Sequence, residues 1–155
     1  MEDFFDCIRK GDLATVQSML DQSPGLIRSR DQRGSTPLIL AAYYEQEGIV
    51  DLLLERGAAV DEKDAGGNTP LMGVCFKGYD SIARKLIEAG ANVDARNSMG
   101  ANCLIFAITF KREAIAGLLI KSGADLKVTD AHGNTALDHA RMQGLTSLIG
   151  ILENQ

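Results

Sequence analysis

The chain has no tryptophan, and aromatic residues make up only 5% of its 155 positions. Histidine and cysteine are almost as scarce, since the sequence contains only His132, His139, Cys7, Cys75 and Cys103. The cysteines lack the CxxC spacing of a zinc site, and no HExxH motif, Ser–His–Asp triad or GxxxxGK[ST] phosphate loop can be identified. The sequence therefore predicts a protein that is not an enzyme and that needs neither a cofactor nor a metal.

A net positive charge and long apolar runs are lacking too. The net charge is −5 at pH 7, whereas binding of a nucleic-acid backbone requires a basic face. The apolar runs fall far short of the roughly 20 residues that cross a bilayer, and the N-terminal segment MEDFFDCIRKGD is unlike a signal peptide. An odd number of cysteines without paired spacing indicates reduced thiols. We therefore expect a soluble, cytoplasmic protein that binds neither nucleic acid nor a membrane.

What the sequence does contain is a repeat with a period of 33 residues, clearest from Asp64 to Arg96. Its first, fourth and eighth positions are held by Asp or Asn, by Gly and by Leu. These residues are Asp31, Asp64, Asn97 and Asp130, then Gly34, Gly67, Gly100 and Gly133, then Leu38, Leu71, Leu104 and Leu137. A period of this length is typical of stacked units that bury their apolar faces against one another. The predicted fold class is an all-α repeat solenoid.

Each copy predicts a turn followed by two helices. In residues 31–63, the Asp and Gly of the first four positions suit a tight turn. Thr36 then caps a helix expected over about 37–44, and a proline at the first helical position costs no hydrogen bond. The second helix is expected over about 48–56 and ends at Gly57, a left-handed C-cap. In the third copy Asn102 replaces the threonine and is an equally good cap.

The two ends depart from the repeat as terminal units should. Residues 1–30 lack the opening turn but show two helical patterns, followed by a turn at Ser23-Pro24-Gly25. In the last copy Glu153 occupies a position that is apolar in the inner copies, as expected where no further unit follows. We therefore predict one domain, with an N-terminal cap at 1–30, internal repeats at 31–63, 64–96 and 97–129, and a C-terminal cap repeat at 130–155.

The segments Thr36-Pro37-Leu38 and Thr69-Pro70-Leu71, with Ala41-Ala42 and Gly57-Ala58 after the first, resemble the ankyrin repeat family. The resemblance covers residues 31–155 well and residues 1–30 more loosely. It implies helix-turn-helix units with β-turn fingers, and binding of a protein partner through the fingertips and the concave face of the first helices. The family's histidine after Pro-Leu is absent, so its side-chain hydrogen bonds must be missing or replaced. Its position holds Ile39, Met72, Ile105 and Asp138.

The family's variable surface, transferred position by position, predicts a partner-binding site. The ends of the first helices contribute Tyr43, Tyr44, Phe76, Lys77, Phe110 and Met142, and the N-terminal unit contributes Arg9 and Lys10. The turn tips add Arg33, Asn68, Met99 and His132. Aromatic residues flanked by a few cations have the composition of an interface core. The expected partner is a protein of unidentified kind, which the chain regulates or scaffolds.

Three alternatives remain open at this point. The aromatic rings could pack between neighbouring helices as core. The chain could be a self-assembling structural module, a homodimer in which the aromatic stripe meets its own copy, although a monomer is the preferred interpretation. It could also be a redox-responsive regulator that uses Cys75 or Cys103, because Cys103 begins a helix whose dipole would favour a thiolate.

Overall fold

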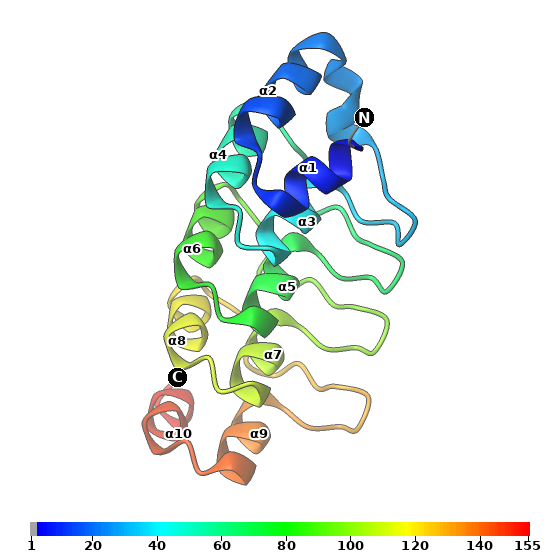
Figure 1. The fold of residues 1–155 in the computed structure, drawn as a ribbon. Helices are drawn as coiled ribbons and strands as arrows, with labels where there is room; N and C mark the ends of the chain where they lie inside the picture. Colours follow the sequence, from blue (N-terminus) through cyan, green and yellow to red (C-terminus); the bar gives the residue numbers. More distant parts are fainter. Residues whose placement is uncertain (1–2) are drawn as a thin grey trace.

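In the computed structural model, residues 3–155 form five stacked helix pairs (Figure 1). The prediction of an all-α repeat solenoid is confirmed, and within the described residues no β-strand occurs. No helix of residues 3–155 has both the length and the apolar composition that crossing a bilayer requires. The elements are α1 (Phe4–Lys10), α2 (Leu13–Gln22), the 3-10 helix η1 (Pro24–Arg28), α3 (Pro37–Tyr43), α4 (Glu47–Glu55), α5 (Pro70–Lys77), α6 (Asp80–Glu88), α7 (Cys103–Thr109), α8 (Glu113–Lys121), α9 (Ala136–Gln143) and α10 (Thr146–Glu153).

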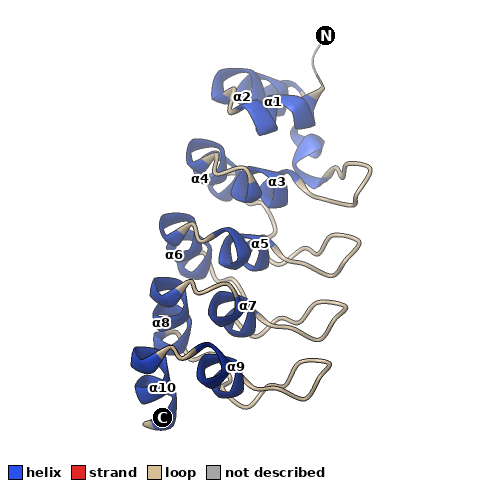
Figure 2. Cartoon of the chain, turned by 60° about the horizontal axis from the view of Figure 1, so that its bottom comes forward, coloured by secondary structure: helices blue, strands red, loops and turns tan. Residues whose placement is uncertain are grey.

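The helices form two rows, with hairpin-like fingers projecting beside the first row (Figure 2). The first helix of each pair packs against the first helix of the next, in the order α1, α3, α5, α7 and α9. The second helices pack on one another less closely than the first helices do. The stack therefore curves toward the side of the first helices and fingers, and we call this side the concave face.

Buried polar caps begin the first helices of the internal units. Side-chain oxygens of Thr36, Thr69 and Asn102 accept hydrogen bonds from the N–H groups of Ile39, Met72 and Ile105, at 3.2, 3.3 and 2.9 Å. Asn102 therefore replaces threonine without loss of the cap, as predicted. Such a cap satisfies an N–H group that would otherwise lack an acceptor inside the protein.

The last unit replaces the family's histidine contacts with a reciprocal cap. The Thr135 hydroxyl accepts from the Asp138 N–H at 3.2 Å, and the Asp138 carboxylate accepts from the Thr135 N–H at 2.9 Å. This capping box satisfies two N–H groups at the start of α9. It accounts for an acidic residue at a position that is apolar in the three preceding units.

The centre of the core lies between the two rows of helices. The leucines of the eighth repeat position are fully buried in the internal units, with Leu38, Leu71 and Leu104 no more than 1% exposed. In the helix pair of α9 and α10 the equivalent Leu137 is only half-buried. The core therefore runs along the axis of the stack and thins at its end.

One local prediction was too simple. Ser23-Pro24-Gly25 is not a bare turn, because Pro24 begins the 3-10 helix η1. The fixed φ of proline suits the first residue of a helix, and Leu26 and Ile27 of η1 pack against the core. The first unit is thus joined to the second by a structure that the later junctions lack.

Two sets of side chains connect successive units through backbone groups. The first set, which we call the cation ladder, is Arg30, Lys63 and Arg96. Each donates to the carbonyl oxygen 33 residues further along, at 2.7 Å for Arg30 to Lys63 and 3.0 Å for Lys63 to Arg96, and Arg96 reaches Thr129. Carbonyl groups at the base of the second, third and fourth fingers are thereby bonded to the unit before each.

The second set consists of carboxylates, which we call the carboxylate bridges. Asp61 accepts a hydrogen bond from the N–H group of Asn92 at 2.9 Å, and Asp94 accepts one from Asp125 at 2.7 Å. In both bridges the acceptor and donor are 31 residues apart. The same type of contact thus links the first internal unit to the second, and the second to the third.

Candidate functional site

Four aromatic side chains lie exposed at the ends of the first helices on the concave face. Tyr43, Tyr44, Phe76 and Phe110, which we call the aromatic row, are 39%, 44%, 38% and 38% exposed. By contrast, Leu71 on the same helix as Phe76 is 1% exposed. The alternative in which these rings form core is therefore inconsistent with the structure.

The rings of the aromatic row contact one another across units. The ring centroids of Phe76 and Phe110 are 4.6 Å apart in an edge-to-face arrangement, and those of Tyr43 and Tyr44 are 5.5 Å apart. The Lys77 ammonium lies 5.0 Å from the Tyr43 ring centroid and 5.9 Å from that of Tyr79. Both kinds of contact are favourable, and they restrict ring motion before any partner binds. The row therefore consists of two preorganised ring pairs, which together extend from α3 to α7.

Phe106 extends this surface and was missed in the sequence. Its ring is half-buried and stacks on Phe110, with a centroid distance of 6.2 Å and an interplanar angle of 20°. The signal for it was present, because residues four apart on a helix lie on the same face. The Phe106 ring packs against the Phe110 ring, so Phe106 belongs to the same candidate site.

The N-terminal end of the aromatic row borders a groove of about 1020 Å³. The groove lies between α1, α3 and the first fingers, and Phe5, Ile39, Tyr43 and Tyr44 line its apolar part. Arg9 also lines it, but its guanidinium is bonded to Asp6 at 2.9 Å and to Asp31 at 3.2 Å. Arg9 therefore shapes the groove while its charge is neutralised within the chain.

The remaining predicted site residues are exposed, with the exception of Asn68. Arg33, His132 and Lys10 are exposed, as are Met99 and Met142 at 68% and 62%. Asn68 instead accepts a hydrogen bond from the Asn97 side chain at 3.0 Å and so holds neighbouring fingers together. His132 and Met142 lie in the last unit, one unit beyond Phe110. The structure thus brings together the aromatic residues and Lys77, with the other predicted residues around them.

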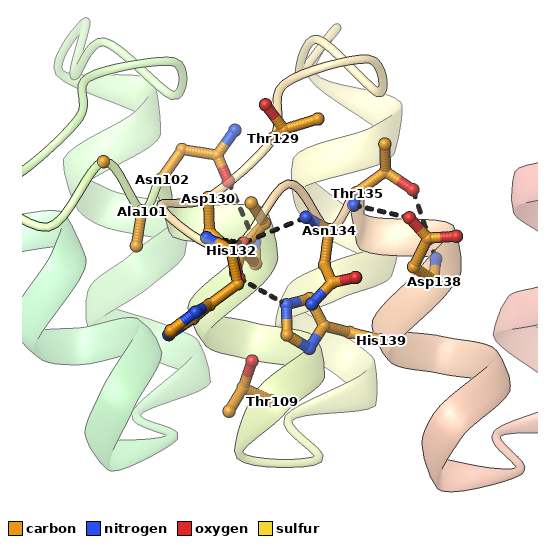
Figure 3. Close-up of polar contacts among 12 residues, drawn as sticks. Ala101, Asn102, Thr109, Thr129, Asp130, His132, Asn134, Thr135, Asp138 and His139 are labelled. Atoms are coloured by element: carbon orange, nitrogen blue, oxygen red, sulfur yellow. Dashed lines mark hydrogen bonds and ion pairs between the residues drawn. The ribbon is translucent and has the colours of Figure 1, made fainter.

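The last finger contains a pair that the sequence did not indicate, Asp130 and His139 (Figure 3). One Asp130 carboxylate oxygen accepts from the N–H groups of His132 and Asn134, both at 3.0 Å, and the other lies 2.7 Å from His139 Nε2. The Asn134 N–H and the His139 ring stabilise the carboxylate and hold the pKa of Asp130 below its ordinary value. His139 is therefore held in place by a defined acidic partner.

Replacing Asp130 with asparagine should lower the free energy of unfolding by about 1 kcal/mol at neutral pH. The difference from the wild type should shrink on acidification. Because the pKa of Asp130 is lowered in the folded protein, its ionised carboxylate stabilises the fold at pH values above the ordinary carboxyl pKa. This stabilisation is lost as the pH falls through the lowered pKa. In the preceding finger, the side-chain amide oxygen of Asn97 accepts the equivalent N–H bonds. The Asp130→Asn variant should therefore retain the conformation of the last finger. Urea unfolding of both proteins from about pH 7 to about pH 2 tests this expectation. A difference that stays constant with pH would contradict it.

The cysteines offer no reactive site. Cys75 and Cys103 are fully buried, and a hydrogen bond with Cys103 together with burial raises the pKa of the Cys75 thiol well above its ordinary value. Oxidation and exchange need the thiolate, which a raised pKa disfavours. These observations oppose the redox-responsive alternative, although Cys103 does begin α7 as expected. In the part of the chain from residue 3 onward, no group of His, Cys, Asp and Glu is arranged to hold a metal ion.

Comparison with known families yields two matches. A family model described as ankyrin repeats in three copies matches residues 4–97, and one described as ankyrin repeats in many copies matches residues 77–140. No curated protein matches the chain. The first match alone covers more than half of the sequence, and the two together run from α1 into α9. The chain therefore belongs to the ankyrin repeat family.

Proposed function

We propose that this chain binds a protein partner through its concave face and regulates or scaffolds it without catalysis. Ankyrin repeats are generally protein–protein interaction modules. The observation that carries the proposal is the aromatic row, four rings 38–44% exposed on a chain whose other large apolar side chains are mostly buried. Rings that are already ordered by mutual contact present large area at small entropic cost.

The occupant is a different protein rather than a second copy of this chain. A two-fold homodimer pairs the same patch on both copies. A homodimer through this site would have to pair one concave face with another, and two surfaces that both curve inward are not complementary in shape. A convex or extended segment of another protein fits the curvature, and a monomer in the reducing cytoplasm remains our prediction.

Replacing Phe76 with alanine should weaken partner binding by about 30-fold, the equivalent of about 2 kcal/mol. Phe76 lies at the centre of the row and contacts Phe110, so its loss removes buried area and a preorganised neighbour together. The measurement is titration calorimetry with a partner isolated on the wild-type chain. Sedimentation of the unbound chain distinguishes a monomer from a homodimer.

Ile151 provides the matched control. Its side chain is 41% exposed, close to Phe76, but it lies on α10 in the second row of helices. Ile151→Ala should leave partner affinity unchanged. If Phe76→Ala binds as tightly as Ile151→Ala does, the concave face is not the binding surface.

A further inference from the structure

The first junction of the stack lacks the contact that closes the next two. Asp61 and Asp94 each accept an N–H group 31 residues further along. One period before Asp61 the chain has Arg28, and the residue at the same separation from Arg28 is Ala59. Among residues 3–155, no oxygen accepts a hydrogen bond from the Ala59 N–H. A basic side chain therefore replaces the carboxylate, and a backbone donor is left to solvent.

Arg28 and Ala59 line the same pocket, of about 490 Å³, at this junction. Two further arginines and one acidic residue, Arg30, Arg56 and Glu62, also line it, and its apolar part comes mainly from Ile27 and Ala58. We call it the arginine pocket. It is separate from the aromatic row, since none of the four rings contributes to it.

The charges of the arginine pocket are not balanced within the chain. Arg30 is paired with Glu62 at 2.7 Å, and Arg56 is paired with Asp21 at 2.6 Å. Arg28 has no acidic partner anywhere in the described part of the chain. Three guanidinium groups therefore face two carboxylates, which leaves one positive charge beside an unused N–H group.

We propose that the arginine pocket binds a small oxyanion, a phosphate or carboxylate group, between the Arg28 guanidinium and the Ala59 N–H. A planar guanidinium and a backbone N–H are the donors that such oxygens accept from most strongly. The bound oxygen takes the place that the Asp61 and Asp94 carboxylates hold at the following junctions. The apolar wall formed by Ile27 and Ala58 accommodates the carbon part of an organic phosphate or acid.

Amide chemical shifts give a direct test on the intact chain. The ¹⁵N-labelled protein is titrated with sodium phosphate, phosphoserine or sodium acetate at an ionic strength held constant with sodium chloride. The Ala59 amide should shift saturably, while the Asn92 and Asp125 amides, which already donate to carboxylates, should not move. Tighter binding of phosphoserine than of inorganic phosphate identifies an organic phosphate as the ligand, and tighter binding of acetate identifies a carboxylate.

Arg28→Asp should abolish anion binding, because the introduced carboxylate would occupy the position of the bound anion. The introduced carboxylate has the position of Asp61, so the Ala59 amide should shift without added anion and phosphate affinity should fall at least about tenfold. Arg28 is exposed, so the fold is retained, and far-UV circular dichroism verifies this. Arg33→Ala removes an exposed arginine outside the pocket and should leave the titration unchanged. An Ala59 amide that does not respond to any of the anions, or that responds equally in Arg28→Asp, would overturn the proposal.

Discussion

Replacing Leu71 with alanine is expected to lower the free energy of unfolding by about 3 kcal/mol. Leu71 is 1% exposed in α5, at the middle of the stack, where units pack on both sides. Alanine leaves a cavity that the neighbouring helices cannot close, because each of them is held in place by its own cap and its own neighbours. Urea unfolding monitored by circular dichroism measures the loss.

The same experiment on Phe76→Ala separates core from surface. Phe76 lies on the same helix but is 38% exposed, so its removal forfeits less buried area and should cost about 1 kcal/mol. Comparing the two losses shows how far the Phe76 ring contributes to the core. Equal losses of unfolding free energy would show that the Phe76 ring is part of the core, which would contradict the assignment of the aromatic row as a binding surface.

The second large effect is expected at Gly67, where a finger turns against its neighbour. Its φ of 81° disfavours any side chain, and a Cβ there would lie 3.0 Å from the backbone nitrogen of Ser98. That nitrogen donates to the Gly66 carbonyl at 3.1 Å and joins the second finger to the third. Gly67→Ala should therefore cost about 1 kcal/mol for the backbone and about 1–2 kcal/mol more for the displaced bond.

Gly133 supplies the control for this effect. It has the same position in the last finger and a φ of 80°, but a Cβ there would meet nothing within 4 Å. Gly133→Ala should thus show only the backbone cost of about 1 kcal/mol. The difference between the two variants measures the contact between fingers. Identical losses would mean that the fingers do not support one another.

The repeat and its helices could be predicted because they depend on local signals. Thr36 and Gly57 mark the start of the first helix and the end of the second by capping chemistry. The helices expected over 37–44 and 48–56 are found at Pro37–Tyr43 and Glu47–Glu55. The same reasoning placed Asn102 as a cap. The division into caps and internal repeats remains a prediction, since it concerns which segments act as units rather than where helices lie.

Contacts between units could not be predicted, because they depend on distances that the period alone does not define. The repeat placed Phe76 and Phe110 in equivalent positions, but only the spacing of α5 and α7 decides that their rings meet and stay exposed. Arg9 was predicted as a cation available to a partner, and its bonds to Asp6 and Asp31 require the first finger to fold beside α1. Asp130 and His139 likewise become partners only when the finger closes over α9.

The cation ladder has a consequence for how the length of such a chain can change. Arg30, Lys63 and Arg96 each reach a main-chain carbonyl, a group that every residue has, one period further along. A duplicated copy of residues 64–96, inserted after Arg96, would therefore find its donors and acceptors already in place on both sides. For the contacts of the cation ladder, adding or removing a whole unit requires no matching change in the neighbouring units. The ladder therefore allows the number of repeats to vary while the sequence of each unit stays the same.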